Sequence, residues 1–319
     1  LNYIILKGYK IMSSIINMID YEAIRFIWWC LIGVLLIGFV IMDGHDMGVG
    51  ILSLFVAKTD NQRRIAINSV APHWDGNQVW FITAGGAIFA AWPIIYSAAF
   101  SGFYIAMLLV LWTLFLRPVA FEYRSKITTN KWRTSWDIVL FIASFVPPVI
   151  FGVAFGNLLQ GVPFYINNEL QVFYTGSFLQ LLNPFALVAG ILSVTMIITH
   201  GANYLMIRTE GEVHLRAKKI ACISPIVVII LFAICGYFIS KMNGFVTTDV
   251  NPHGPSNPLL KTVMITQGAW LNNYTKYPLT LLCPIIAFLG AICSMLFAKK
   301  SRSVLAFISS AFMMVGVIF

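Results

Sequence analysis

Two carboxylates and a histidine lie close together in the middle of a long apolar run. The segment V-I-M-D-G-H-D-M-G, residues 40–48, holds Asp43, His45 and Asp46. Asp43 and Asp46 are three residues apart, so on a helix they share one face. Two negative charges there repel, and at least one carboxylate should hold a proton more tightly than in water. Ionisable groups at membrane depth are costly and usually functional. The pair therefore predicts a proton relay. The alternative is that both carboxylates bend or cap a helix at Gly44.

A second polar cluster, H-W-D-G-N-Q over residues 73–78, opens another apolar run. Aspartate is a favoured helix N-cap, so one interpretation of Asp75 is a cap. The other, compatible with the first, is the mouth or middle of a proton route shared with Asp43 and Asp46. Trp80 lies little more than a helical turn beyond Asp75. Its ring either packs in the bundle or gates a channel for a small molecule.

A run of small residues follows on the same predicted helix. Ala84, Gly85, Gly86 and Ala87 leave a smooth face on which another helix can approach closely. The sequence predicts packing at this face, either within the bundle or against a partner subunit.

An arginine stands near the end of another apolar run, in the sequence L-F-L-R-P. Long basic side chains near helix ends commonly extend to the membrane interface, so the simplest prediction is that Arg117 snorkels to the cytoplasmic side. The competing hypothesis pairs Arg117 with Asp137, at the start of the next run, or with a lipid or quinone head group. Pro118 removes one helix hydrogen bond and so frees a carbonyl group nearby.

His45 and His200 are the histidines that lie deep in apolar runs. Haem ligation in a helical bundle requires axial ligands on facing helices, so one hypothesis is a bis-histidine haem site. The polar neighbours favour the alternative, in which each ring is simply hydrogen-bonded. The five cysteines all lie in apolar runs without a C-x-x-C pair, which predicts buried thiols and no metal site. The motifs of soluble metalloproteases, hydrolases and nucleotide-binding enzymes are absent from the sequence.

Composition sets the class of protein. Apolar residues make up 59% of the chain and charged residues 10%, whereas soluble domains carry about 25% charged residues. The apolar runs are continuous rather than alternating, which predicts an all-α integral membrane protein and not a barrel. Eight runs are expected to span the membrane, the last of them short of a full span. They cover residues 24–57, 76–98, 99–122, 137–157, 181–207, 219–240, 277–298 and 304–319.

Basic residues gather in alternate connections between these runs. They lie in residues 58–73, 123–136, 208–218 and 299–303, while the intervening connections carry few. Because Lys and Arg favour cytoplasmic loops, this predicts that the basic connections are cytoplasmic and that the N-terminus is outside. The same bias explains the net charge of +9 without a nucleic-acid partner.

The chain is predicted to form one polytopic domain over residues 18–319, preceded by an upstream extension at 1–17 with no role in the fold. Residues 40–48 resemble I-I-T-H-G-A-N-Y-L at 197–205, with Gly44 aligned to Gly201 and Asp46 to Asn203. This weak repeat predicts two related four-helix units, at 18–157 and 181–319, of which the second is incomplete.

Several motifs occur together and in order from Met18 to about Phe185. They include D-G-H-D-M-G-V-G, A-P-H-W-D-G-N-Q-V-W, T-A-G-G-A-I-F-A-A-W-P, F-L-R-P-V-A-F-E-Y-R-S-K and G-V-A-F-G-N-L-L-Q-G-V-P-F. In this combination the chain resembles subunit II of the cytochrome bd ubiquinol oxidases. The resemblance implies a bacterial inner-membrane complex that oxidises quinol and reduces O2 to water, and that generates proton motive force without pumping protons.

The same resemblance implies that a large partner subunit carries two b haems, one d haem and the quinol site. This chain would stabilise that subunit and line proton and oxygen routes. Single-span accessory subunits, membrane lipid and a structural ubiquinone are further candidate partners. The family's acidic positions on the proton side match Asp43, Asp46 and Asp75, and a tryptophan near its oxygen passage matches Trp80. Arg117 and Asp137 resemble its membrane-depth charges.

Two departures and one alternative accompany the resemblance. His45 stands where an aromatic residue is expected and adds a group that titrates near physiological pH. The last apolar run is shorter than the family's final span. The alternative is a stand-alone secondary transporter or channel, which should show glycine- or proline-broken half-helices in both halves.

Overall fold

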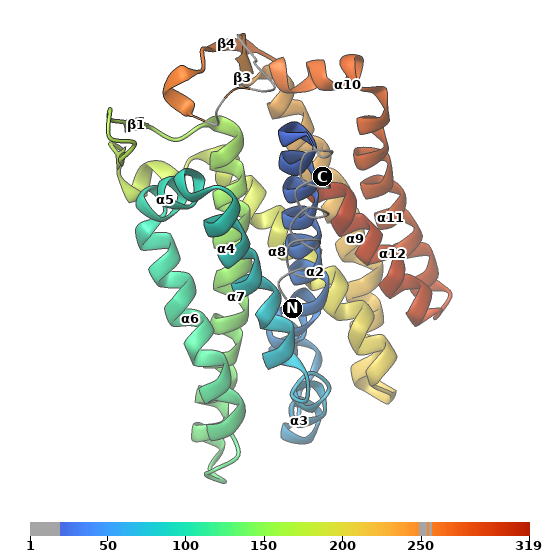
Figure 1. Ribbon diagram of the computed structural model, residues 1–319. Coiled ribbons are helices and arrows are strands. Elements are labelled where there is room, and N and C mark those ends of the chain that lie inside the picture. Colours follow the sequence, from blue (N-terminus) through green and yellow to red (C-terminus); the bar gives the residue numbers. More distant parts are fainter. Residues whose placement is uncertain (1–19, 249–253, 255–256) are drawn as a thin grey trace, which may run out of the picture.

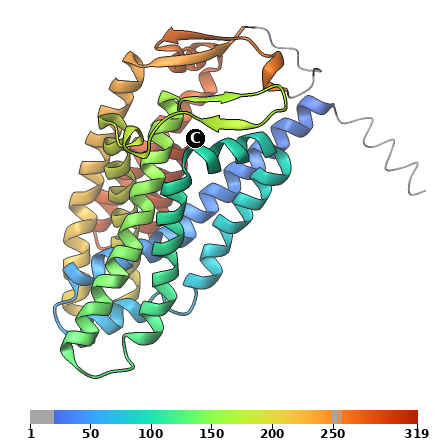
Figure 2. The same cartoon turned by 90° about the vertical axis from the view of Figure 1, so that its left-hand side faces the viewer.

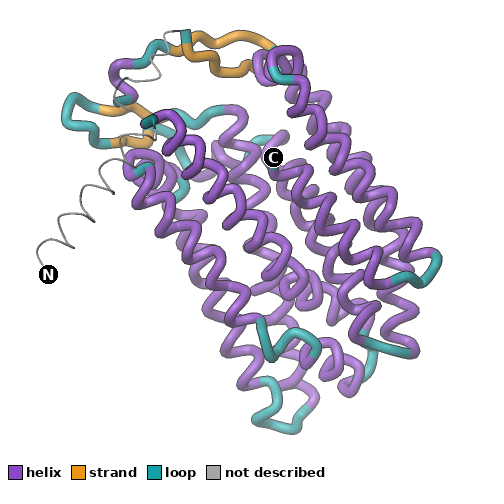
Figure 3. Tube along the Cα trace, turned by 45° about the vertical axis from the view of Figure 1, so that its right-hand side comes forward, coloured by secondary structure: helices purple, strands orange, loops and turns teal. Residues whose placement is uncertain are grey.

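The computed structural model describes residues 20–248, 254 and 257–319. The extension predicted at 1–17 lies outside these residues. Long helices run side by side, with two short β-hairpins at one end of the bundle and the short helix α3 at the other (Figure 1). Figure 3 shows how strongly helix predominates. The all-α class predicted from composition is confirmed.

The long helices follow the predicted apolar runs. They are α2 (Tyr21–Val56), α4 (Trp74–Ala91), α6 (Tyr104–Tyr123), α7 (Asn130–Gln160), α8 (Pro184–Arg208), α9 (Gly211–Lys241), α11 (Leu282–Lys299) and α12 (Ser303–Ile318). The short helices are α3 (Asp60–Asn68), α5 (Pro93–Gly102) and α10 (Asn272–Lys276), with single 3-10 turns at Phe178–Leu181, Pro258–Leu260, Ala269–Leu271 and Pro278–Leu281. Strand β1 (Phe164–Ile166) pairs antiparallel with β2 (Val172–Tyr174), and β3 (Asn243–Thr247) with β4 (Val263–Gln267).

Six helical stretches in the described part of the chain are long and apolar enough to cross a membrane. They comprise α2, α6, α7, α8, α9 and the stretch Pro278–Lys299. Helix α4, whose first turns are polar, and α12, with 16 residues, are not among them. The prediction of a multi-span protein is therefore confirmed, whereas the number eight stays a prediction.

The predicted boundary between the second and third runs is wrong. Helix α4 ends at Ala91, and a separate helix, α5, continues to Gly102 before α6 begins. Pro93 has no N–H to donate and disfavours α conformation in the residue before it, and Trp92 adopts φ −139° and ψ 73°. The chain turns at this point and α5 packs on strand β2.

Helix α2 lies at the centre and packs against α4, α7 and α8. At its crossing with α8, a Cβ added to Gly48 would overlap the backbone of Gly201, and a Cβ on Gly201 would overlap Gly48. Missing side chains at both positions allow the two backbones to touch. The two segments of the weak repeat thus pack against each other, while their division into two four-helix units stays a prediction.

The basic connections gather at one end of the bundle, opposite the hairpins (Figure 2). Arg216 donates to the carbonyl of Val56, and Lys218 donates to Ser301. Arg124 donates to Asp60. These contacts join turns that are far apart in the sequence into one surface.

Candidate functional site

Helix α2 carries its polar cluster into the most enclosed part of the bundle. Every residue from 43 to 53 is buried, because α2 has neighbours on all sides. Asp43 is 0% exposed, His45 5% and Asp46 2%. A helix surrounded in this way needs no apolar stripe, and its polar groups must find partners within the protein.

Asp43 forms a doubly hydrogen-bonded ion pair with Arg117 of α6. Arg117 Nη1 donates to Oδ2 at 3.0 Å and Nη2 donates to Oδ1 at 2.8 Å. Arg117 is only 1% exposed, and its guanidinium lies 5.9 Å from the ring centre of Trp74. The predictions that Arg117 snorkels, or pairs with Asp137, are therefore wrong. Its planar fork matches a carboxylate, and burial leaves it no polar route to water.

Asp46 faces a different environment, without a basic residue bonded to it. Asn77 Nδ2 of α4 donates to Asp46 Oδ2 at 2.8 Å. The other oxygen, Oδ1, is buried and has no hydrogen-bond donor among the described residues. It lies 3.3 Å from His45 Nε2 and 3.4 Å from His73 Nδ1. Asp46, His45 and His73 form the cluster that we call the Asp46 cluster.

His73 connects the Asp46 cluster to the basic end of the bundle. Its side chain is 36% exposed, although its Nδ1 atom points inward. Burial of the ring is the main factor that lowers the pKa of His73 below its ordinary value; Arg208 adds to the effect and a backbone hydrogen bond at Ser69 opposes it. The ring thus has one nitrogen toward Asp46 and one edge toward the surface.

Sequence reasoning did not join His73 and Asn77 to Asp46. Their spacing of four residues at a helix start places them on one face and was the available signal. Tyr204, whose ring lies 4.3 Å from His45, carried no local signal.

His200 is fully buried but is not a free haem ligand. Its Nε2 lies 3.1 Å from the carbonyl of Ile41, its Nδ1 lies 2.8 Å from the Ser310 hydroxyl, and its ring stacks on Phe307 at 4.2 Å. The His45 ring stands edge-on to it, with centroids 6.0 Å apart. Two rings so arranged leave no slot for a porphyrin between them, so this geometry does not support a bis-histidine haem.

Asp75 lies in the first turn of α4 and is exposed. The N-cap is His73, so the prediction that Asp75 caps this helix is wrong. Its carboxylate still sits near the positive end of the helix dipole. Within the described residues no hydrogen bond or ion pair joins Asp75 to Asp43 or Asp46.

Helix α4 has an inner and an outer face. On the inner face Ala84 is 1% exposed, and the Trp80 ring fills the space where a Cβ on Gly38 of α2 would stand. On the outer face a Cβ added to Gly85 or Gly86 would meet nothing within 4 Å. The outer face also exposes Val79, Ile82 and Phe89.

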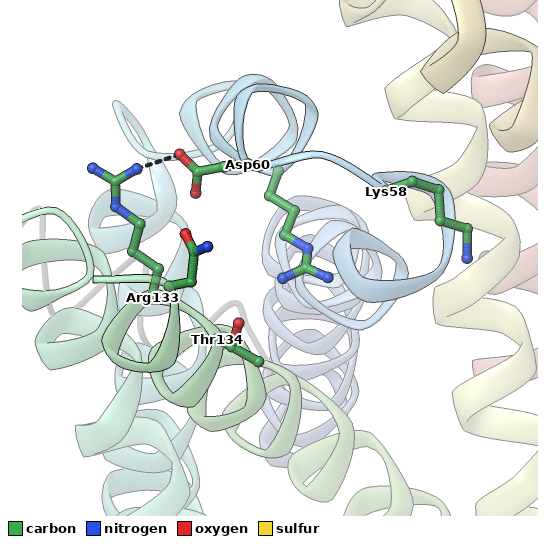
Figure 4. Close-up of a pocket in the computed structure, with 6 residues that line it drawn as sticks. Lys58, Asp60, Arg133 and Thr134 are labelled. Carbon is green, nitrogen blue, oxygen red and sulfur yellow. Dashed lines mark hydrogen bonds and ion pairs between the residues drawn. The ribbon is translucent and has the colours of Figure 1, made fainter. Parts of the chain in front are cut away.

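Asp137 belongs to an ion network at the basic end. Its carboxylate is buried and accepts hydrogen bonds from Arg124 and, at 3.0 Å, from Arg63. Asp60 accepts from Arg124 at 2.8 Å and from Arg133, which Figure 4 shows reaching toward it. Desolvation opposes ionisation of Asp60, but the hydrogen bonds and charges of Arg124 and then Arg133 outweigh it and lower the pKa of Asp60. The network joins α3, α6 and α7.

Comparison with known proteins gives consistent relationships. A family model described as cytochrome bd terminal oxidase subunit II matches residues 24–319. Cytochrome bd-I ubiquinol oxidase subunit 2 of Escherichia coli K12 is 54% identical over 296 residues, covering 92% of this chain and 78% of that protein. A probable cytochrome oxidase subunit 2 of Haemophilus influenzae is 52% identical over 302 residues, covering 94% and 80%. A chain of the bd oxidase structure from Geobacillus thermodenitrificans superposes with a TM-score of 0.69 at 14% identity, over 92% of this chain and 82% of that one, which shows the fold.

Asp137→Asn tests the ion network. Removing this charge leaves Arg63 and Arg124 short of a buried partner, and we expect the free energy of unfolding to fall by about 3–5 kcal/mol. The control is Glu212→Gln, which removes the partner of Arg216 in an exposed pair and should cost less than about 1 kcal/mol. Thermal unfolding of the two detergent-solubilised variants is the measurement. Equal shifts would contradict a structural role for Asp137.

Proposed function

The chain belongs to the family of cytochrome bd terminal oxidase subunit II, and we propose that it works beside a haem-bearing large subunit in a bacterial inner membrane, in a complex that oxidises quinol and reduces O2 to water. The E. coli relative is named a ubiquinol oxidase subunit. The gathering of basic connections at one end supports a cytoplasmic location for that end, with the N-terminus outside.

The haems belong in the partner subunit under this proposal. A haem in this chain would need histidines that face each other across an open slot. His45 and His200 stand edge to face, and His214 bonds to the carbonyl of Met206. These residues do not fit a haem.

The Asp46 cluster is the observation that carries the proposed role. It links a buried carboxylate to the basic end of the bundle through Asn77 and the half-exposed His73. Asp75 stands at the surface in the same turn of α4. We propose that protons enter at Asp75 and His73 and pass inward to Asp46 and His45. These side chains can accept and donate protons, and they extend from the surface into the bundle.

Asp43 has a different proposed role, although it lies one helical turn from Asp46. Both of its oxygens accept hydrogen bonds from Arg117. It acts as the fixed counter-charge that holds α6 to α2 beside the route. For the same reason Arg117 is not free to bind a quinone or lipid head group, and that hypothesis is not carried forward.

Trp80 is proposed to border an oxygen passage. Its ring lies between α4 and α2 against Gly38, within the apolar part of the bundle. O2 is small and apolar, and such surroundings admit it while they exclude ions.

The transporter alternative requires helices broken at matched positions in both halves. Helix α2 runs unbroken through Gly44 and α8 runs unbroken through Gly201. Continuous helices, together with family membership, favour the oxidase subunit.

Asp75→Asn, in complex with the large subunit, tests the proton-uptake line. The neutral amide cannot pass on a proton, so quinol-dependent oxygen uptake per haem should fall at least about tenfold while haem content stays normal. Glu122→Gln, another exposed carboxylate at the basic end, is the matched control and should leave uptake unchanged. Loss of haem from Asp75→Asn would instead assign this residue to assembly.

Gly86→Leu tests whether the outer face of α4 receives the large subunit. Small residues allow close helix approach, so a leucine there should abolish or strongly reduce co-purification of the partner. Gly236→Leu is the control, because a Cβ at Gly236 of α9 likewise meets nothing within 4 Å. Equal recovery of the large subunit with both variants would show that the outer face of α4 is not the interface.

A further inference from the structure

Three possible metal-ligand atoms converge inside the Asp46 cluster. Asp46 Oδ1 is buried and receives no hydrogen bond, and His45 Nε2 and His73 Nδ1 stand within 3.4 Å of it. All three possible ligand atoms lie within 4.8 Å of one another. A cation could bind all three atoms if each presents a lone pair. The hydrogen bonds made by the other ring nitrogens show where the protons of His45 and His73 lie.

His45 has its proton on the other nitrogen. Its Nδ1 lies 3.1 Å from the carbonyl oxygen of Ile41, one helical turn earlier. A carbonyl oxygen only accepts, so Nδ1 carries the hydrogen and donates it. In the neutral ring, Nε2 therefore presents a lone pair toward Asp46.

The same argument applies to His73. Its Nε2 lies 2.9 Å from the hydroxyl of Tyr204, and that hydroxyl donates its only proton to the carbonyl of Ser69, also at 2.9 Å. His73 Nε2 must then carry the hydrogen that Tyr204 accepts. Its Nδ1 is left with the lone pair, which accepts a hydrogen bond from Asn77 Nδ2 at 3.1 Å. A metal ion bound at Nδ1 would displace this N–H.

The spacing of these atoms suits a small cation. Zinc binds nitrogen and oxygen ligands at about 2.0–2.2 Å, so the ligand atoms of a tetrahedral site stand roughly 3.3–3.6 Å apart. The distances from Asp46 Oδ1 to His45 Nε2 and His73 Nδ1 are 3.3 Å and 3.4 Å. Two edges of such a tetrahedron are present without any movement.

Each ligand also has an outer partner of the kind that orients metal ligands. His45 is held by the Ile41 carbonyl, His73 by the Tyr204 hydroxyl and Asp46 by the Asn77 amide. Histidines that bind metals usually donate their second N–H in this way, and carboxylate ligands are hydrogen-bonded in turn. The half-exposed edge of His73 gives an ion access from the basic end of the bundle.

We propose that His45, Asp46 and His73 form a binding site for a divalent transition metal ion of the zinc type. The site draws two ligands from α2 and one from the residue that caps α4, so it would also fasten these helices together. The cysteine pattern predicted no metal site. The sequence also carried no sign that His73 and Asp46 meet, because they come together only through the packing of α4 on α2. This inference rests on side-chain geometry, and it uses three residues of the proposed proton route, so a bound ion would occupy that route.

The test counts zinc bound by the complex of this chain with its large subunit, purified through a tag that contains no histidine. The complex is stripped with a chelator, dialysed against Zn2+ and washed, and zinc per haem is measured by mass spectrometry. Zinc-edge X-ray absorption then gives the ligand distances. The variants are His45→Phe and Asp46→Asn, with His200→Gln as the control, since His200 is a buried histidine outside the ligand set.

We expect one retained zinc per complex, with nitrogen and oxygen ligands at about 2.0–2.2 Å. His45→Phe and Asp46→Asn should weaken its Kd at least about 100-fold, because loss of an outer partner alone costs about 10–100-fold. His200→Gln should keep it. No retained zinc, or equal zinc in all four proteins, would overturn the proposal. If His45→Phe does not assemble, His73→Gln replaces it, with the same two outcomes. The zinc count does not depend on oxygen uptake, so failure of the proton route leaves this test intact.

Discussion

The dominant constraint on this molecule is that a charge inside an apolar bundle needs a partner within reach, because no water is present to solvate it. Asp43 and Arg117 satisfy that requirement for each other across α2 and α6. The bond fixes where α6 stands relative to the central helix. At the basic end the buried carboxylate of Asp137 meets the same requirement through Arg63 and Arg124.

Asp46 differs because the pairing of Asp43 leaves no basic residue for it. Its neighbours are an amide and two imidazoles, and an imidazole can carry a proton or bind a metal. One helical turn therefore separates a carboxylate held on both oxygens by an arginine from one that has an oxygen without a hydrogen-bond donor. That contrast is the physical basis for placing function at Asp46 and support at Asp43.

Much of this arrangement was readable from the sequence. Continuous apolar runs predicted the all-α class, and the polar residues within them marked Asp43 and Asp46 as groups at membrane depth, whereas Arg117 was expected to reach the membrane interface. Pro93 also carried a signal for the break after α4, which the apolar run concealed. The partner of Arg117 was predicted wrongly, because residues far apart in the sequence meet only through helix packing. For the same reason the contacts of His73 with Asp46 and Tyr204 were beyond local patterns.

The most direct measurement compares Asp43→Asn and Asp46→Asn in complex with the large subunit, by haem content and by oxygen uptake per haem. Asp43→Asn leaves Arg117 buried without a counter-charge, which costs about 3–5 kcal/mol, so haem-loaded complex should be lost. Asp46→Asn should assemble with normal haem and consume oxygen slowly. An Asp43→Asn complex with full haem, or an Asp46→Asn complex with normal uptake, would contradict the division of roles between these two carboxylates.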